Sequence, residues 1–299
     1  MSRPILFAAS LIWVALGLMA AAPGIVGGDS PELTAAAFHL GSAHAPGYPL
    51  FITLGHLFQL LPVGTIAFRM TFFSIIVQAA AYLVLTGIFL KLRKDASSAV
   101  GENILPFLAA GLVFAGPLVF RQLVSPEVFA LHLLFVTILL RFVLFSSVSN
   151  FLTASFLAGV ALSHQHLTLL IAPAVVWAYR SYFKNPARLI TALSFFVLGL
   201  SPYLGLSLRA VQDPPVNWGN PRTFTNSFIT FLVVNMAATL TKGRFSTAFG
   251  TSISTLKISA RNPLVLGFFF LFSVFGKAGN ILNLNISSVV FAYSSFCPF

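Results

Sequence analysis

The chain has 299 residues, of which 58% are hydrophobic and only 8% are charged, and its mean hydropathy is +0.93. A soluble fold of this length cannot bury so much apolar surface, so the composition predicts an all-α integral membrane protein with a polytopic helical bundle. The net charge of +11 could suit nucleic acid, but most cations stand at the ends of apolar runs, which indicates positive-inside anchoring. We therefore expect the lipid bilayer as a partner and no nucleic acid.

The first predicted element is an unbroken apolar run, residues 4–26, that follows Arg3. At about 1.5 Å of rise per residue, a helix of this length can cross a hydrocarbon core of roughly 30 Å. The alternative is a cleaved signal peptide, because Ala20-Ala21-Ala22 resembles a cleavage site. The run is long for a signal peptide, so we favour a retained span with the N-terminus in the cytoplasm.

A polar island, residues 27–49, comes next on the outer side and holds two of the six acidic residues. Ser30 can cap a helix, Pro31 suits its first position, and Glu32 complements the dipole of its first turn. The apolar spacing up to Gly41 predicts a short amphipathic helix that lies on the membrane surface. Residues 48–63 are apolar but too short to span, so we expect a re-entrant or interfacial piece.

The later apolar runs are predicted to cross the membrane in alternating directions. Residues 66–90 form the second span, and the basic residues at 91–94 mark its cytoplasmic end. Residues 104–124 return outward, and residues 125–145 cross back. Residues 151–179 are too long for one span and are predicted to form two helices that meet at a polar break, 163–166, near the outer face. Three further cations, Arg180, Lys184 and Arg188, mark the cytoplasm before residues 189–208 lead to an outer loop, 209–225.

This topology gathers ionisable side chains on the outer side, where charge beside a membrane usually has a function. They are Asp29, Glu32, His44, Glu127, His164, His166 and Asp213. After residue 225 the apolar runs are short or interrupted. We therefore divide the chain into a transmembrane core, residues 1–225, and poorly matching hydrophobic C-terminal segments, residues 226–299.

Ordered sequence motifs carry a resemblance to a known family. The first joins Gly28-Asp29-Ser30-x-Glu32 to His44-x-Pro46-Gly47-Tyr48-Pro49-Leu50. The later ones begin at Glu127, Gly159, Ser201 and Asp213 and read EVFALH, GVALSHQH, SPYL and DPPVNWGNP. From about residue 22 to residue 225 the chain resembles a multi-spanning family whose animal member is a protein O-mannosyltransferase acting on plexin-type receptors.

The resemblance implies a GT-C glycosyltransferase fold, in which the sugar comes from a polyprenyl or dolichyl phosphate carrier. It also implies a catalytic acid in the first outer loop, where Asp29 stands. Two positions depart from the family pattern, since Pro31 replaces a small residue and Gln165 replaces a second histidine. No family pattern follows residue 225, so we expect a chain that is truncated relative to other members.

Transfer of a sugar from a lipid phosphate to a hydroxyl needs a base near the acceptor. We assign that base to Asp29, and Glu32 to orienting the acceptor as a second catalytic residue. Each acid has a simpler explanation, because an acid in the first turn of a helix complements the helix dipole. The same alternative applies to Glu127, which we count among the substrate-binding residues.

The remaining predicted substrate contacts surround the phosphate and the sugar. Positive or hydrogen-bonding groups are needed there, and an arginine fork suits a phosphate, while an aromatic ring can stack on a sugar. The candidates are His44, Tyr48, Arg121, His164, His166, Arg209 and Trp218. The alternatives are structural histidines, arginines that snorkel to headgroups and an interfacial tryptophan. A divalent metal held by Asp29, Glu32 and the histidines is the weaker hypothesis, so we assign no metal ligand and no cofactor.

The resulting hypothesis is a membrane glycosyltransferase that moves a mannose-like sugar from a polyprenyl-phosphate donor to a hydroxyl, such as a protein Ser or Thr, on the outer face. The alternatives are a non-catalytic transporter or lipid-binding protein, and an inactive fragment of a longer enzyme. Transporters tend to hold ionisable residues near the bilayer midplane and to show repeated halves. The acids of this chain stand instead at the ends of the predicted spans.

Overall fold

The computed structural model describes residues 3–94 and 104–223, which belong to one compact unit. Within these ranges the backbone is almost entirely helical, and the β-structure is limited to one isolated bridge between Ser42 and Asn217. The predicted all-α class is therefore confirmed for the described part of the chain. The C-terminal segments predicted for residues 226–299 lie outside the described residues.

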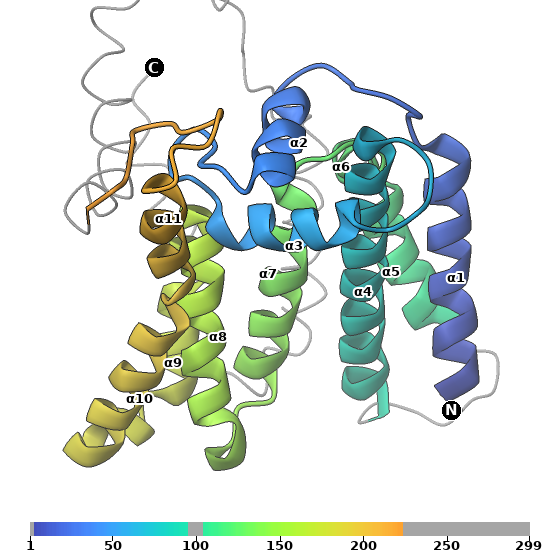
Figure 1. The fold of residues 1–299 in the computed structure, drawn as a ribbon. Helices are drawn as coiled ribbons and strands as arrows, with labels where there is room; N and C mark the ends of the chain where they lie inside the picture. The colour runs from blue at the N-terminus through green and yellow to red at the C-terminus, as the bar shows by residue number, and fades with distance from the viewer. Residues whose placement is uncertain (1–2, 95–103, 224–299) are drawn as a thin grey trace, which may run out of the picture. The chain divides into compact units, whose positions relative to one another are not determined.

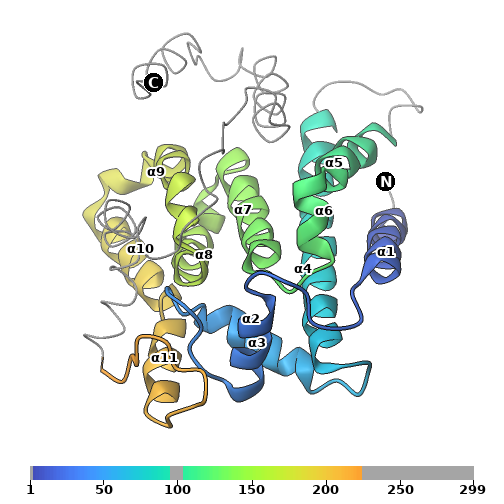
Figure 2. The ribbon, with the colours of Figure 1, turned by 90° about the horizontal axis from the view of Figure 1, so that it is seen from above.

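Eleven α-helices and three short 3-10 helices follow one another in the described ranges. The α-helices are α1 (Arg3–Ala20), α2 (Ser30–His39), α3 (Pro49–Gln59), α4 (Ile66–Lys94), α5 (Leu105–Ala115), α6 (Pro117–Leu123), α7 (Val128–Leu144), α8 (Phe151–His164), α9 (Ala172–Tyr179), α10 (Pro186–Gly199) and α11 (Pro202–Ala210), and the 3-10 helices are η2 (Val148–Asn150), η3 (His166–Leu170) and η4 (Tyr182–Lys184). Figures 1 and 2 show the long helices side by side, with α1 at one side and α10 at the other. Helix α3 runs nearly at right angles to the long helices (Figure 1) and packs against α4, α8 and α11, as expected of an interfacial helix rather than a span.

Two helical segments have the length and composition to cross a membrane. They are Ile66–Arg93, within α4, and Pro186–Ala210, which joins α10 to α11. They match the spans predicted at 66–90 and 189–208. The apolar helices in α1, α5, α7 and α8 are shorter. Most of the Pro186–Ala210 segment is exposed, so the other described helices leave much of its apolar surface uncovered.

Proline divides one of the predicted spans. We predicted one uninterrupted span over residues 104–124, and the structure divides this run into two helices, because α5 ends at Ala115 and α6 begins at Pro117. Pro117 has no N–H to donate to the preceding turn, and it disfavours helical backbone at the residue before it. Gly116 accordingly adopts an extended conformation with ψ of 132°. The break predicted at residues 163–166 is confirmed, because α8 ends at His164 and η3 begins at His166.

The start of α2 differs from the prediction by one residue. Asp29, rather than Ser30, is the N-cap, and Ser30 is the first helical residue and is fully buried. The apolar face of α2 is covered by protein, since Leu33 and Ala36 are fully buried in a core cluster that includes Phe51 of α3. The α2 helix is therefore docked on the protein itself.

Helices α8 and α10 pack closely through a pair of glycines. A β-carbon on Gly159 would collide with the carbonyl oxygen of Phe196, and one on Gly199 would collide with that of Phe156. Small residues at such crossings let two backbones approach within van der Waals contact, which is a main source of helix association in membranes. This contact fixes α8, the helix whose last residue is His164, against α10.

We expect Gly159→Ala to lower the free energy of unfolding by about 1–3 kcal/mol, because the backbone on both sides must move to admit the methyl group. Thermal unfolding of the purified protein in detergent measures this. Gly205→Ala, in α11, is the matched control, since no atom lies within 4 Å of the added β-carbon. An equal loss of stability in both variants would mean that the α8–α10 contact is not a tight one.

Candidate active site

Two acids stand at the beginning of α2, which packs against α3. Asp29 is the N-cap, and its backbone carbonyl accepts a hydrogen bond from Leu33 N–H at 2.9 Å. Glu32 lies in the first turn. The Asp29 side chain is 57% exposed and that of Glu32 is 26% exposed, so Asp29 is the carboxylate that a substrate can reach more easily.

His44 lies between these two acids. Its backbone N–H donates to Glu32 Oε1, and its ring Nδ1 lies 3.1 Å from Glu32 Oε2. The other ring nitrogen, Nε2, lies 3.8 Å from Asp29 Oδ2. Because one carboxylate contacts both the backbone and Nδ1, Glu32 orients the imidazole and turns Nε2 toward Asp29.

Tyr48 covers the same group from the side of α3. Its ring meets that of His44 edge-on with centroids 5.3 Å apart, and its hydroxyl lies 3.5 Å from His44 Nε2. Burial, with added repulsion from Asp29, raises the pKa of the Tyr48 hydroxyl to about 12, although a hydrogen bond with Gln165 opposes this. Tyr48 thus remains a protonated donor at neutral pH.

Glu127 comes from a distant part of the chain to the same place. It is the N-cap of α7, and its Oε1 lies 3.4 Å from where a β-carbon on Gly28 would stand. Burial raises the pKa of the Glu127 carboxyl, and the Asp29 carboxylate raises it further, while Arg121 and His44 act in the opposite direction. We call Asp29, Glu32, His44, Tyr48 and Glu127 the Asp29 cluster.

His164 lies behind the Asp29 cluster. It is fully buried, its Nε2 lies 2.9 Å from the carbonyl oxygen of Val128, and its ring stacks on Phe51 at 6.2 Å. Its centroid is 6.3 Å from that of Tyr48. This places His164 as a support for Tyr48 and for the start of α7, and a direct contact with substrate stays a prediction.

The other predicted contacts differ in their distance from the cluster. Arg121, in the last turn of α6, is exposed and lies near enough to Glu127 to influence its carboxyl. Arg209, in the last turn of α11, is exposed, and no hydrogen bond or ion pair joins it to the cluster within the described ranges. His166 is half-buried at the start of η3. For these residues a role in binding stays a prediction.

The loop with Trp218 is attached to the first loop through Ser42. Ser42 N–H donates to the carbonyl of Val216 at 2.9 Å, and Trp218 N–H donates to the carbonyl of Ser42 at 3.0 Å. The Trp218 side chain is 57% exposed. Asp213, at the other end of this loop, pairs with Arg222 at 2.6 Å and takes no part in the Asp29 cluster.

Three residues of the site were not among the predicted contacts. Gln165 reaches the Tyr48 hydroxyl, Gly28 makes room for Glu127, and Ser42 joins the two loops. Gly28 belongs to the first motif, and Gln165 stands between two histidines, so both had a signal in the sequence. Ser42 had none, because its partners come from a loop about 175 residues further along the chain.

Across residues 3–94 and 104–223, no group of three His, Cys, Asp or Glu side chains is arranged to hold a metal ion. In the Asp29 cluster, Glu32 already bonds to His44 through both carboxylate oxygens. The described residues thus offer a site in which an exposed carboxylate, Asp29, lies beside an imidazole and two further carboxylates. An apolar helical bundle with such a site at one end is suited to proton transfer from a hydroxyl.

Comparison with known proteins identifies the family to which the chain belongs. Residues 29–189, which include the Asp29 cluster, match the family model described as the protein O-mannosyl-transferase TMEM260 N-terminal domain. The chain therefore belongs to the TMEM260 family of protein O-mannosyl-transferases. The resemblance found in the motifs is confirmed.

Two curated relatives carry the name protein O-mannosyl-transferase TMEM260. The one from Mus musculus is 31% identical over 249 residues, which cover 78% of this chain and 34% of the relative. The one from Dictyostelium discoideum is 28% identical over 237 residues, which cover 70% of this chain and 28% of the relative. The chain thus spans about a third of the length of these relatives. No solved structure gives a significant match.

The raised pKa of Glu127 predicts a pH-dependent effect of its neutral analogue. Above its raised pKa the ionised Glu127 destabilises the folded state, so Glu127→Gln should raise the thermal midpoint at pH 8. This gain should shrink as the pH falls through the raised pKa toward the ordinary value of 4.5, where wild-type Glu127 is also neutral. Thermal unfolding from pH 4 to 8 measures the difference.

Asp213→Asn is the control variant, for which the opposite change in stability is expected. The hydrogen bond and charge of Arg222 lower the pKa of Asp213, so its ionised form stabilises the fold. The variant should unfold at the same or a lower temperature than wild type at pH 7. A gain of stability in Asp213→Asn, or none in Glu127→Gln, would contradict the assigned surroundings.

Gly41 tests the attachment between the two loops. A β-carbon there would collide with the carbonyl oxygen of Val216, which is also the acceptor for Ser42 N–H. We expect Gly41→Ala to separate the loops and to increase proteolysis near Trp218, without loss of helical content by circular dichroism. Gly24→Ala is the control, because nothing lies within 4 Å of its β-carbon. Equal proteolysis in both variants would contradict the attachment.

Proposed function

We propose that this chain is the catalytic part of a GT-C-type glycosyltransferase that moves mannose from a polyprenyl-phosphate donor to a Ser or Thr hydroxyl of a protein on the outer face. Family membership supports the transferase class, and the relatives' name supports mannose and a protein acceptor. The observation that carries the proposal is the Asp29 cluster, in which an exposed carboxylate is gathered with an oriented imidazole and a buried tyrosine.

In the proposed reaction Asp29 takes the proton of the acceptor hydroxyl. The hydroxyl oxygen forms a bond to the anomeric carbon of mannose while the bond from that carbon to the phosphate oxygen breaks. The polyprenyl phosphate leaves with the electron pair, and the proton on Asp29 later returns to solvent. The exposure of Asp29 allows an acceptor to approach, and no metal ion is needed to balance this step.

Glu32 and His44 act on Asp29 rather than on the acceptor in this scheme. Glu32 accepts from both the backbone and the ring side of His44, so few of its lone pairs remain for a substrate. His44 then presents Nε2 to Asp29 and to the Tyr48 hydroxyl. We assign Glu32 as the residue that positions this imidazole, a narrower role than the acceptor contact predicted from the sequence.

The departing phosphate needs positive charge, because the Asp29 cluster itself is rich in carboxylates. Arg121 and Arg209 are both exposed and stand at the same end of the bundle as Asp29. A guanidinium can bind a phosphate through two parallel hydrogen bonds. We assign the phosphate to these arginines and the sugar to Trp218, whose exposed ring lies in the attached loop.

The distribution of charge supports placing this end outside. All four acids of the described ranges lie at the end with α2 and α3. Most cations lie at the opposite end, where α4, α7 and α9 finish and α10 begins; these are Lys91, Arg93, Lys94, Arg141, Arg180, Lys184 and Arg188. By the positive-inside rule this opposite end faces the cytoplasm. The N-terminus of α1 then lies on the cytoplasmic side as well.

We expect Asp29→Asn to reduce mannosyl transfer at least 100-fold, because a positioned base contributes about 10² to 10⁴ in rate. The assay uses purified protein in membranes with radiolabelled polyprenyl-phosphate mannose and a Ser/Thr-rich peptide. Asp213→Asn removes the same charge at the same end and should retain activity within a few fold.

The thermal midpoint of each variant separates loss of activity from loss of fold. Asp29→Asn with wild-type turnover would remove Asp29 as the base. Glu32→Gln should reduce transfer less than Asp29→Asn does, since the amide can still bond to His44.

A further inference from the structure

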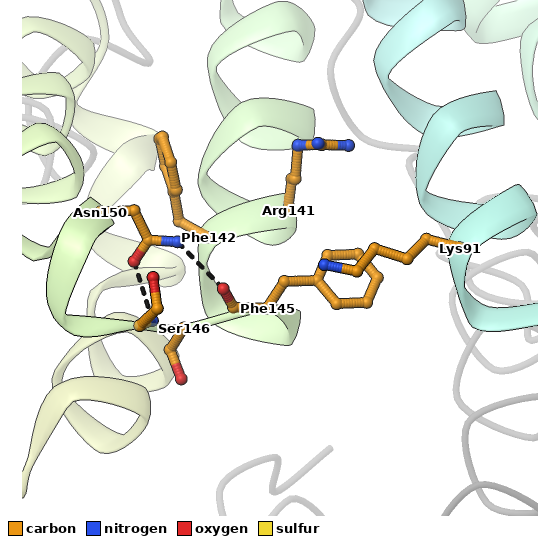
Figure 3. Close-up of a pocket in the computed structure, with 7 residues that line it drawn as sticks. Lys91, Arg141, Phe142, Phe145, Ser146 and Asn150 are labelled. Carbon is orange, nitrogen blue, oxygen red and sulfur yellow. Dashed lines mark hydrogen bonds between the residues drawn. The ribbon is translucent and has the colours of Figure 1, made fainter. Parts of the chain in front are cut away.

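A second polar feature lies at the end of the bundle opposite to the Asp29 cluster. It is a pocket of about 450 Å³ between the last turns of α4 and α7 and the turn that leads to α8 (Figure 3). Seven residues line it: Lys91, Arg141, Phe142, Phe145, Ser146, Ser147 and Asn150. None of the steps proposed for mannosyl transfer uses this pocket.

The pocket carries two positive charges that no described carboxylate balances. Lys91 Nζ stands 3.9 Å from the centre of the Phe145 ring, and Figure 3 shows Arg141 directed toward the same space from α7. Among the described residues that line the pocket there is no acid. Two like charges on one pocket repel each other, and an anion between them removes that cost.

The wall of the pocket is held in place by hydrogen bonds. Asn150 Oδ1 accepts from the Ser147 N–H at 2.9 Å and from the Tyr179 hydroxyl at 2.6 Å, and Asn150 Nδ2 donates to the Phe145 carbonyl at 2.9 Å. The turn between α7 and α8 is therefore fixed before any ligand arrives. The exposed hydroxyl of Ser146 adds a donor at the mouth.

The surroundings of the pocket favour a lipid. Ile104 and Leu105 at the start of α5, and Val148 beside the α7–α8 turn, are apolar and each at least 60% exposed at this end of the bundle. A cationic pocket bordered by exposed apolar side chains matches a charged headgroup with its acyl chains alongside. Basic pockets between helices on the cytoplasmic side are a known mode of binding for anionic headgroups.

We propose that this pocket binds the phosphate of an anionic phospholipid of the cytoplasmic leaflet, with Lys91 and Arg141 as the phosphate ligands. The choice of the cytoplasmic leaflet depends on the orientation given under the proposed function. The choice of an anionic phosphate as the ligand depends only on the residues of the pocket. Arg141 supplies the forked donor and Lys91 the point charge, while the rings of Phe142 and Phe145 face the glycerol and the first methylenes.

A simpler explanation is that both cations merely neutralise helix ends and mark the cytoplasmic side. That explanation applies equally to Arg180, which lies at the same end, stacks on Trp177 and does not line the pocket. Arg180→Gln is therefore the matched control for Arg141→Gln.

The test titrates the full 299-residue protein, in neutral detergent, with phosphatidylglycerol or phosphatidylcholine, and measures bound lipid by native mass spectrometry. We expect phosphatidylglycerol to bind in preference, and Arg141→Gln and Lys91→Gln each to weaken it about fivefold, the effect of one cation near a charged membrane surface. Arg180→Gln should change binding less than twofold. Equal losses in Arg141→Gln and Arg180→Gln would overturn the site.

Two further measurements ask whether the bound phosphate belongs to a lipid or to a free phosphate ester, and whether binding depends on the proposed catalysis. Glycerol 3-phosphate at millimolar concentration should not stabilise the protein. If it stabilises wild type but not Arg141→Gln, and phosphatidylglycerol does not bind, the lipid assignment is wrong. Asp29→Asn should bind phosphatidylglycerol as wild type does. Failure of the mannosyl-transfer proposal thus leaves the lipid measurement unaffected.

Discussion

The position of the candidate base depends on the burial of α2 and α3 against α4 and the core of the bundle. Leu33 of α2, Phe51 of α3 and Phe73 of α4 are almost fully buried in one core cluster, and His164 stacks on Phe51 beneath them. Burial of a large apolar side chain contributes about 1.5–3 kcal/mol. Because Asp29 caps α2, the same packing that buries the apolar face holds its carboxylate toward solvent.

The Asp29 cluster brings several negative charges close together, and their repulsion raises its free energy. Asp29, Glu32 and Glu127 converge, and among the described residues His44 and Arg121 offer positive or hydrogen-bonding compensation near them. Of the three, Glu127 has a pKa raised by burial and by the Asp29 carboxylate, and perturbed carboxylates of this kind are typical of functional sites. A phosphate donor adds further negative charge, so arginines at the same end are a physical requirement of the proposed reaction. The two ends of the bundle thus divide the charge: acids gather where transfer is proposed, and cations gather where the lipid pocket lies.

Local patterns in the sequence predicted most helices and the members of the Asp29 cluster, but they misplaced some helix boundaries. The long apolar run of α4 and the polar break at His164 are visible in one dimension, since both follow from hydropathy and length. The break at Pro117 is also a local signal, yet the apolar composition of 104–124 concealed it. Ser30 matched the capping preference as well as Asp29 did, but in the folded protein Ser30 is already helical and buried, and Asp29 takes the N-cap position without a side-chain hydrogen bond.

The sequence by itself determined the helical class, the family and the two acids of the first loop, because hydrophobic length and short ordered motifs are properties of neighbouring residues. Tertiary structure alone decided which distant residues meet those acids. The contact of Glu127 with Gly28, the approach of Gln165 to Tyr48 and the bridge from Ser42 to the Trp218 loop all join segments far apart in the chain. Such contacts arise from packing in three dimensions, which no local pattern encodes, and the cationic pocket between the ends of α4 and α7 has the same origin.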